Sequence, residues 1–267
     1  MPMTINTNVV SLNAQRNLSM SQSSLATSMQ RLSSGLRVNS ARDDAAGLAI
    51  ATRQDAQIRG INVAIRNAND GVSLAQTAEG ALATMTDALQ RMRELAVQAL
   101  NGSNGTTDRA NLDTEWQALA SEVTRIAAQT KFNGTAIVGA SAGAQVFQVG
   151  ANSGDTLTIT TTQVTTVGGG ITTTTLAGTA LTDIDTKLDA INTSRASYGA
   201  AMSRFSMAIQ NLQISGENQS AARGRIMDAD FAAETANLSR SQILQQAGSA
   251  MVAQANQLPN QVLALLR

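Results

Sequence analysis

The chain has 267 residues, and its 19 basic residues balance 19 acidic ones, so no net charge would draw it to nucleic acid or to an anionic membrane surface. Aromatic residues make up only 2% of the sequence and charged residues 14%, which favours thin layers of paired helices over a thick globular core. Because Cys and His are both absent, disulfides, thiolate chemistry and the commonest metal ligand are excluded.

The first expected helix lies near the N-terminus and carries a narrow stripe at spacings of four and three. The stripe consists of Ala14, Leu18, Gln22, Leu25, Met29, Leu32 and Leu36. Such spacing forms a seam by which helices pair side by side. No acidic residue precedes Asp43, whereas a solvated helix normally carries mixed charge. We therefore predict that residues 1–42 form a helix that packs against other helices.

A long helix is expected next, because Pro occurs only at positions 2 and 259. Ser40 and Asp43, followed by Asp44, predict its start by capping and by charge at its positive end. The helix should stop at the turn-forming residues 101–105. A shorter helix is then expected over about 107–129.

The middle of the chain predicts a small β region. Residues 145–149 and 156–162 are β-branched and alternating, and a Gly- and Asn-containing turn lies between them, which indicates a hairpin. The Thr-rich stretch 156–182 has too few large apolar groups to build a core of its own. We expect a strand-and-loop excursion on an outer surface rather than a second domain.

A returning helix is predicted from 181 to 228, because its apolar residues fit one heptad frame over 46 residues. At about 1.5 Å per residue it would be roughly 70 Å long, against some 35–40 Å for a compact domain of this chain length. The sequence thus predicts a mainly α fold: an elongated antiparallel bundle or coiled coil of long helices from the two halves, with a small β-hairpin region between them.

The C-terminal segment 229–267 repeats the pattern of the first helix. Its stripe consists of Leu244, Gly248, Met251, Ala255, Leu258, Val262 and Leu265, and no acid follows Glu234. A lone helix would leave such a seam in water, so the two ends should pair with each other or with copies of themselves. We take the apolar members Leu18, Leu25, Met29, Leu32, Leu36, Leu244, Met251, Leu258, Val262 and Leu265 as the predicted self-assembly seam.

Several motifs identify a family resemblance. Residues 32–50 (LSSGLRVNSARDDAAGLAI), 66–71 (RNANDG), 76–82 (QTAEGAL) and 91–98 (RMRELAVQ) resemble the N-terminal signature of bacterial flagellins. Phe132-Asn133-Gly134, residues 225–232 (RIMDADFA) and 254–259 (QANQLP) match the family as well. The similarity covers roughly residues 1–139 and 181–267, so the chain resembles a short flagellin without large outer insert domains.

The resemblance implies a structural subunit that polymerises with many copies of itself into the extracellular flagellar filament used for swimming. Residues 1–42 would pair with 229–267 in an inner tube, and 43–180 with 181–228 would form an outer helical domain. The start of the chain lacks a signal-peptide pattern, so we expect export through the flagellar type III channel without a cleaved signal. The implied partners are an export chaperone at the C-terminal helix and the flagellar cap and hook–filament junction proteins.

The resemblance also places Arg91, Leu95 and Glu115 where flagellins contact the vertebrate flagellin-sensing Toll-like receptor. Arg91 is equally typical of an outward helix face, and Leu95 of packing between subunits, so both interpretations stay open. No catalytic, metal or cofactor motif accompanies these residues, and no apolar run is long enough for membrane insertion. We therefore expect neither an enzyme nor a cofactor. The alternatives are a hook–filament junction protein and another secreted coiled-coil protein.

Overall fold

The structure, a computed structural model, describes residues 7–139, 141–160 and 167–265, with side chains as far as Gln257. The chain is divided into two compact units. The terminal unit comprises residues 1–56 and 218–267, and the middle unit comprises residues 57–217. Within the described residues the elements are five helices and four short strands, which confirms the predicted mainly α class with a small β region.

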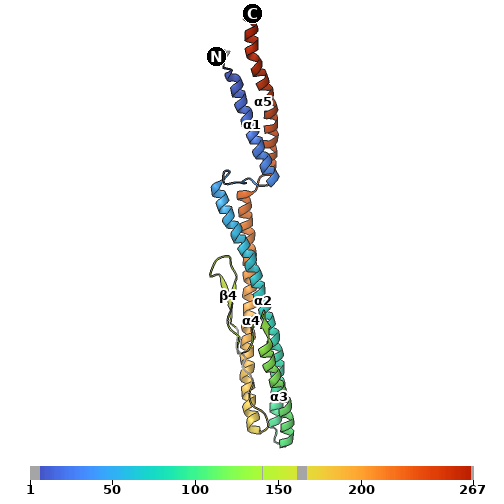
Figure 1. Ribbon diagram of the computed structural model, residues 1–267. Helices are drawn as coiled ribbons and strands as arrows, with labels where there is room; N and C mark the ends of the chain where they lie inside the picture. The colour runs from blue at the N-terminus through green and yellow to red at the C-terminus, as the bar shows by residue number, and fades with distance from the viewer. Residues whose placement is uncertain (1–6, 140, 161–166, 266–267) are drawn as a thin grey trace. The chain divides into compact units, whose positions relative to one another are not determined.

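The terminal unit contains α1 (Val9–Ser34) and α5 (Phe231–Leu265), which lie side by side and antiparallel (Figure 1). The first residues of α2 (Ala45–Leu100) and the last of α4 (Thr174–Met227) complete it. Helix α1 ends at Gly35, a left-handed residue with φ of 72° whose amide donates to the carbonyl of Arg31. Helix α5 begins after Asp230, whose Oδ1 accepts the amides of Ala232 and Ala233.

Helix α2 starts later than the predicted cap at Ser40. The Asp44 carboxylate accepts the amide of Gly47 and serves as the N-terminal cap. Ser40 instead donates its hydroxyl to Asp43, which also accepts the amides of Asn39 and Ser40. These bonds lower the pKa of Asp43, with the side-chain bond from Ser40 as the largest cause. Asp43 therefore stabilises the turn before the helix rather than the helix start itself.

The segment between α1 and α2 is held to the end of α4. The amide of Arg37 donates to the carbonyl of Met227 at 2.6 Å, and Leu36 and Asp228 form an isolated antiparallel bridge. Val38, Ala51 and Met227 are buried together as a small apolar cluster. These contacts all lie inside the terminal unit. The segment between α1 and α2 is therefore packed against the end of α4.

The middle unit is built from α2, α3 (Thr106–Gln129) and α4. Helices α2 and α4 run antiparallel, because Arg93 of α2 pairs with Asp185 at 2.7 Å while the earlier Glu79 pairs with the later Arg195 at 2.8 Å. Helix α2 buries a face of Leu, Met and Ala at spacings of three and four, as its sequence rhythm predicts. The fully buried large side chains of the unit include Leu82, Met85, Leu89, Met92, Leu95, Trp116, Ile184, Tyr198 and Phe205.

Gly71 lets α2 and α4 approach closely. A Cβ at this position would lie 2.7 Å from Cζ of Phe205. The Phe205 ring also packs edge-on against Phe147, with ring centroids 5.5 Å apart. The absence of a side chain at position 71 thus makes room for the aromatic contact that joins the helices to the β region.

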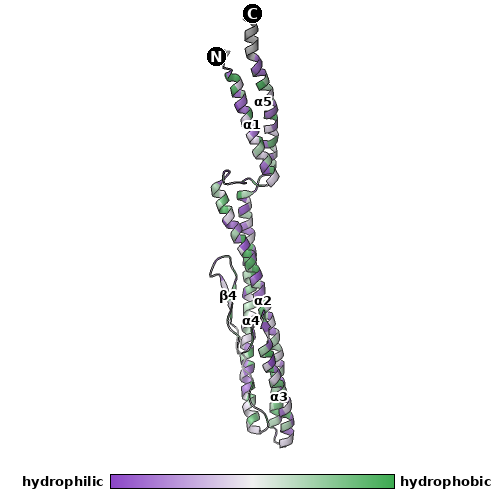
Figure 2. Ribbon diagram, in the orientation of Figure 1, coloured by the Kyte–Doolittle hydropathy of each residue, from purple (hydrophilic) through white to green (hydrophobic). Residues whose placement is uncertain are grey.

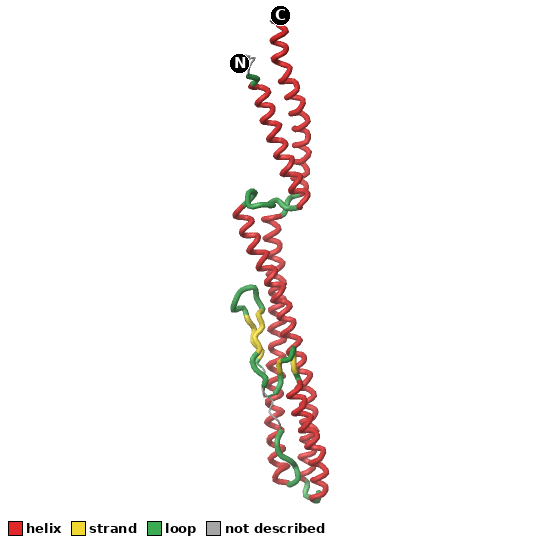
Figure 3. Tube along the Cα trace, in the orientation of Figure 1, coloured by secondary structure: helices red, strands yellow, loops and turns green. Residues whose placement is uncertain are grey.

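The strands are short and form two antiparallel pairs (Figure 3). One pair joins β1 (Lys131–Phe132) to β2 (Thr135–Ala136), and the other joins β3 (Gln145–Gln148) to β4 (Thr156–Ile159). The second pair confirms the predicted hairpin and sets Gln145 opposite Ile159. The Asn67 side chain of α2 donates to the Gln148 carbonyl at 3.0 Å, so the hairpin is tied to the helical core.

Helix α4 begins at Thr174, earlier than the predicted start at 181. The reason is that a Thr run can cap a helix as well as form a strand. The hydroxyl of Thr173 accepts the amide of Leu176, and Ala177 is already fully buried in the first turns. Val167 and Ile171 are buried too, so this stretch contributes to the core of the middle unit.

Tyr198 generates a test of the middle unit. Its hydroxyl donates to the Ile137 carbonyl at 3.0 Å inside the core, and burial raises the pKa of Tyr198 to about 12. Because the pKa is higher when folded than when unfolded, stability should fall as pH rises from about 10 towards 12. We expect Tyr198→Phe to cost about 1–2 kcal/mol at neutral pH by leaving a buried carbonyl unpaired, and to flatten that alkaline fall.

Thermal unfolding followed by circular dichroism at neutral and alkaline pH measures both effects. Tyr198 is the single Tyr of the chain, so ultraviolet absorbance titrates it directly in the folded protein and in urea. Equal titration midpoints in the two states would contradict the burial of the Tyr198 hydroxyl.

Candidate interaction surface

The contact between α1 and α5 joins the two ends of the described chain. The hydroxyl of Ser11 donates to Oδ1 of Asn256 at 2.7 Å, and the side-chain amide of Asn8 donates to the Ala255 carbonyl at 2.8 Å. Asn8 also caps α1 by accepting the amide of Ser11. One capping residue thus both begins α1 and binds it to α5.

The most deeply buried side chains between α1 and α5 are small or polar. Ser11, Ser28, Ser241 and Ala255 are buried, and Leu18, Leu25, Leu32, Leu238 and Val252 are half-buried beside them. Small residues bring helix axes close but remove little apolar area from water. The contact therefore combines close fit and hydrogen bonds with partial burial of aliphatic side chains.

Gly248 shows how close the approach is. A Cβ at this position would lie 3.2 Å from Cδ1 of Leu18 and 3.6 Å from its Cβ. Any side chain here would have to displace Leu18 or separate the helices. Gly248 of the predicted stripe is therefore a residue of the contact within the chain.

An ion pair lies at the other end of the contact. Arg31 Nη1 is 3.7 Å from Oε2 of Glu234, and Glu234 is 8% exposed. Nε of Arg31 is buried without a hydrogen-bond partner in the described residues. Helix α1 contains no acidic residue and Glu234 is the single acid of α5, so this carboxylate balances positive charge that no other acid of the two helices can reach.

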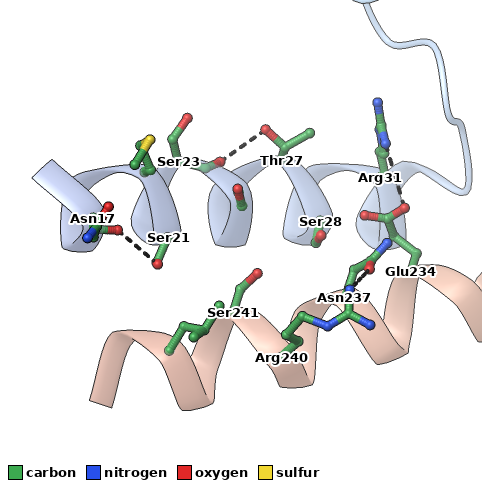
Figure 4. A pocket seen from close by; sticks show the side chains of 13 residues that line it. Asn17, Ser21, Ser23, Thr27, Ser28, Arg31, Glu234, Asn237, Arg240 and Ser241 are labelled. Atoms are coloured by element: carbon green, nitrogen blue, oxygen red, sulfur yellow. Dashed lines mark hydrogen bonds and ion pairs between the residues drawn. The ribbon is translucent and has the colours of Figure 1, made fainter. Parts of the chain in front are cut away.

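A polar groove of about 700 Å³ runs along the helix pair (Figure 4). Hydroxyl and amide side chains from both helices line it, with Arg31, Glu234 and Arg240 on its walls. The lining residues are Asn17, Met20, Ser21, Ser23, Ser24, Thr27, Ser28, Arg31, Glu234, Asn237, Arg240, Ser241 and Leu244. Two of these hydroxyls bond to backbone carbonyls of their own helix, Ser21 to Asn17 and Thr27 to Ser23, each at 3.0 Å.

A second groove of about 520 Å³ lies between the same helices and is more apolar. Val9, Val10 and Leu18 of α1 face Leu244 and Met251 of α5 across it. The remaining lining residues are Asn13, Ala14, Asn17, Ser21, Ala247 and Gly248. Hydrophobic residues are interspersed with hydrophilic ones along both helices (Figure 2). The large hydrophobic side chains exposed on the pair are Val9, Val10, Leu12, Met20, Met29, Phe231, Ile243, Leu244 and Met251.

The predicted seam is divided between two surfaces. Leu18, Leu25, Leu32 and Leu36 are half-buried within the terminal unit. Met29, Leu244 and Met251 are instead 58%, 50% and 58% exposed, so the chain itself does not cover them. The side chains of Leu258, Val262 and Leu265 lie outside the described residues.

The residues of α5 that face α1 recur at the same spacing as the predicted stripe, but most of them are different residues. On α5 the inward positions are 234, 238, 241, 245, 248, 252 and 255, which alternate steps of four and three. The predicted stripe shares only Gly248 and Ala255 with them. Sequence reasoning missed Glu234 and Ser241, and Ser11 and Ser28 on α1, because it sought the most apolar stripe. The spacing alone, with polar residues admitted, would have found them.

A charged cluster on α2 and α3 contains two of the predicted receptor residues. Arg91 donates through Nε to Glu115 at 2.9 Å and through Nη1 to Glu94 at 2.8 Å. These bonds, led by the one to Glu115, raise the pKa of Arg91. All three side chains are exposed, so the cluster presents one cation held between two carboxylates.

Leu95 does not belong to this surface. It is 1% exposed and packs in the core of the middle unit with Met92 and Ala96. The family resemblance placed Leu95 among the receptor contacts, and packing between subunits was the alternative, but this side chain is covered within the middle unit. The exposed apolar residue nearby is Val97, which with Gln90, Arg93, Glu94 and Gln98 lines a shallow groove.

Neither a metal site nor a membrane span emerges from the described residues. They contain no group of three or more His, Cys, Asp or Glu that could hold a metal ion. None of the described helices is apolar over a length that could cross a bilayer.

Comparison with known proteins gives matches along nearly the whole chain. Residues 5–142 match the family described as the bacterial flagellin N-terminal helical region, and residues 181–266 match the bacterial flagellin C-terminal helical region. The flagellin of Halalkalibacterium halodurans is 44% identical over 272 residues, covering 99% of this chain and 100% of that protein. Flagellin B of Vibrio cholerae is 35% identical over 375 aligned residues and is covered completely, as is this chain.

A solved structure agrees with these sequence matches. The crystal structure of Bacillus cereus flagellin matches with a TM-score of 0.52 and 33% identity, covering 59% of this chain and 94% of that one.

The ion pair between α1 and α5 generates a prediction. Glu234→Gln leaves Arg31 without its carboxylate, and we expect the helix pair to lose about 1–2 kcal/mol, between the values typical of exposed and of buried pairs. Hydrogen exchange with mass spectrometry should show faster exchange in α1 and α5 and no change in α3. Glu217→Gln, which removes an exposed carboxylate from α4, is the matched control. Equal exchange in the two variants would contradict the role of Glu234.

Proposed function

The chain belongs to the bacterial flagellin family and is a structural subunit of the flagellar filament, and we propose that it polymerises through the exposed apolar side chains of α1 and α5. The helix pair, with residues 1–42 against 229–267, would line the inner tube. Residues 43–228 would form the outer layer. The 44% identity with a flagellin along 99% of the chain favours this role over that of a hook–filament junction protein.

The observation that carries the proposal is the division of apolar residues on α1 and α5. The pair buries Ser11, Ser28 and Ser241 inside and leaves Leu244 and Met251 in water. Exposed apolar groups that line a groove gain free energy when a second copy removes them from water, at about 25 cal/mol per Å². A head-to-tail contact between unlike patches does not close on itself, so it propagates into a filament.

The same exposed residues suggest how the subunit is handled before assembly. Phe231 and Ile243 of α5 are exposed together with Leu244 and Met251. An export chaperone that covers α5 would prevent premature association, which agrees with export through the flagellar type III channel. The cap and the hook–filament junction proteins would then meet the same helices at the two ends of the filament. We propose a structural and not a catalytic role throughout.

Two side chains test the assembly surface directly. We expect Leu244→Ser combined with Met251→Ser to raise the critical concentration for polymerisation at least about tenfold, because two half-exposed apolar groups are lost from the subunit contact. Sedimentation and negative-stain electron microscopy measure the polymer. The helix content of the monomer should stay unchanged, since neither side chain is buried within it.

Ile214→Ser is the matched control, because Ile214 is as exposed as these two but lies in the middle unit. It should polymerise at nearly the wild-type concentration. Filaments of normal yield from the double variant would contradict the proposed surface.

A second function, recognition of the monomer by the vertebrate flagellin-sensing Toll-like receptor, is supported by the charged cluster. Arg91 is held between Glu94 and Glu115 in one geometry before any partner binds, which lowers the entropy lost on association. We propose that Arg91 and Glu115 form the contact and that buried Leu95 supports it from the core.

Arg91→Ala should lower the potency of monomeric protein in a receptor reporter-cell assay about tenfold or more. Arg125→Ala is the matched control, because Arg125 is equally exposed on α3 and pairs with Glu122 in the same way. Equal potency of the Arg91 variant and wild type would remove Arg91 from the contact.

A further inference from the structure

We propose that Met20, Met29 and Met251 form an oxidation site, at which hydrogen peroxide converts the monomer into a form that polymerises only at higher concentration. The chemistry of the site concerns the monomer alone. Its consequence for assembly rests on the function proposed above. The chain exposes these sulfur atoms and buries its Trp and Tyr side chains.

The three residues are the accessible methionines of the terminal unit. Met20, Met29 and Met251 are 55%, 58% and 58% exposed. Met85 and Met92 are 0% exposed, and Met227 is buried against Val38 and Ala51. Met207 is similarly exposed, at 60%, but lies in the middle unit. Met1 and Met3 lie outside the described residues.

No faster target competes with these thioethers. The sequence contains no Cys, whose thiolate would otherwise react first, and no His. Its single Trp and single Tyr, Trp116 and Tyr198, are buried in the core of the middle unit. Peroxide that meets the folded monomer is therefore directed to exposed methionine sulfur.

The reaction balances without any further reagent. The thioether sulfur attacks one oxygen of hydrogen peroxide, the O–O bond breaks, and the other oxygen leaves as water after a proton transfer. The sulfur loses two electrons to become a sulfoxide, and the peroxide is reduced by two. Sulfoxide formation turns a flexible apolar side chain into a polar one that accepts hydrogen bonds.

The position of these residues gives the reaction its consequence. Met251 lines the apolar groove with Leu244, and Met20 lines the polar groove beside Ser24 and Thr27. Met29 extends from α1 outside the contact with α5. A sulfoxide leaves the monomer intact, because none of the three packs inside it. Burying the same sulfoxide in a subunit contact leaves a polar group without a partner.

The test begins with folded monomer treated with hydrogen peroxide, quenched over time and mapped by peptide mass spectrometry. We expect Met20, Met29 and Met251 to gain one oxygen atom each at least about tenfold faster than Met85 and Met92, as their exposure predicts. Similar rates at exposed and buried positions would overturn the site, whether or not the protein polymerises.

The second step measures polymerisation of untreated and oxidised monomer. Oxidation should raise the critical concentration about tenfold or more, and methionine sulfoxide reductase should restore it. A variant carrying Met20→Leu, Met29→Leu and Met251→Leu should polymerise when untreated and keep that ability after peroxide. Met207→Leu alone, the matched control, should remain as sensitive as wild type.

Loss of polymerisation by the oxidised triple variant, or protection by Met207→Leu, would overturn the assignment to these three residues. Failure of the untreated wild-type protein to polymerise would instead contradict the proposed function, while the mass-spectrometric rates would still decide the oxidation site.

Discussion

The close approach of α1 and α5 is the constraint on which the rest of the terminal unit depends. A Gly at position 248 against Leu18 and a row of serines allow the helices to meet with little apolar area between them. Glu234 supplies the negative charge that this pair otherwise lacks. The fully buried positions are small or polar, the Leu side chains between the helices are only half-buried, and Met29, Leu244 and Met251 are exposed. The positions that face inward between α1 and α5 therefore also determine which apolar side chains remain exposed on the pair.

Helix type and extent were largely predictable from the sequence. The absence of Pro between positions 2 and 259 and the regular apolar spacing indicated the long helices. The hairpin predicted from 145–149 and 156–162 was confirmed at 145–148 and 156–159, and positions 161–162 lie outside the described residues. The predictions of where helices begin were the ones that were wrong. Ser40 was expected to cap α2, but Asp44 does so, and α4 begins at Thr174 rather than 181. Ser, Thr and Asp can all cap the N-terminus of a helix, so the sequence did not show which of the neighbouring candidates would do so.

The candidate surface was less predictable, for a physical reason. An apolar stripe indicates that a helix has a partner but does not say whether the partner belongs to the same chain. Met29, Leu244 and Met251 were assigned to the same seam as Leu18 and Leu25, yet the structure separates the exposed from the half-buried. Leu95 is the opposite case, because the resemblance that placed it among surface contacts cannot reveal that neighbouring elements of the middle unit cover it. Both distinctions require knowledge of which elements lie together.

The hydrogen bond from Ser11 to Asn256 spans 245 positions along the chain, and this separation has a consequence for the order of events during synthesis. Helix α1 leaves the ribosome before the middle unit, whereas its intramolecular partner α5 is made after the middle unit. Until α5 has been made, α1 therefore has no intramolecular partner. The middle unit can already fold by contacts between residues nearer in sequence. The two helices can therefore pair only after the whole middle unit has been made.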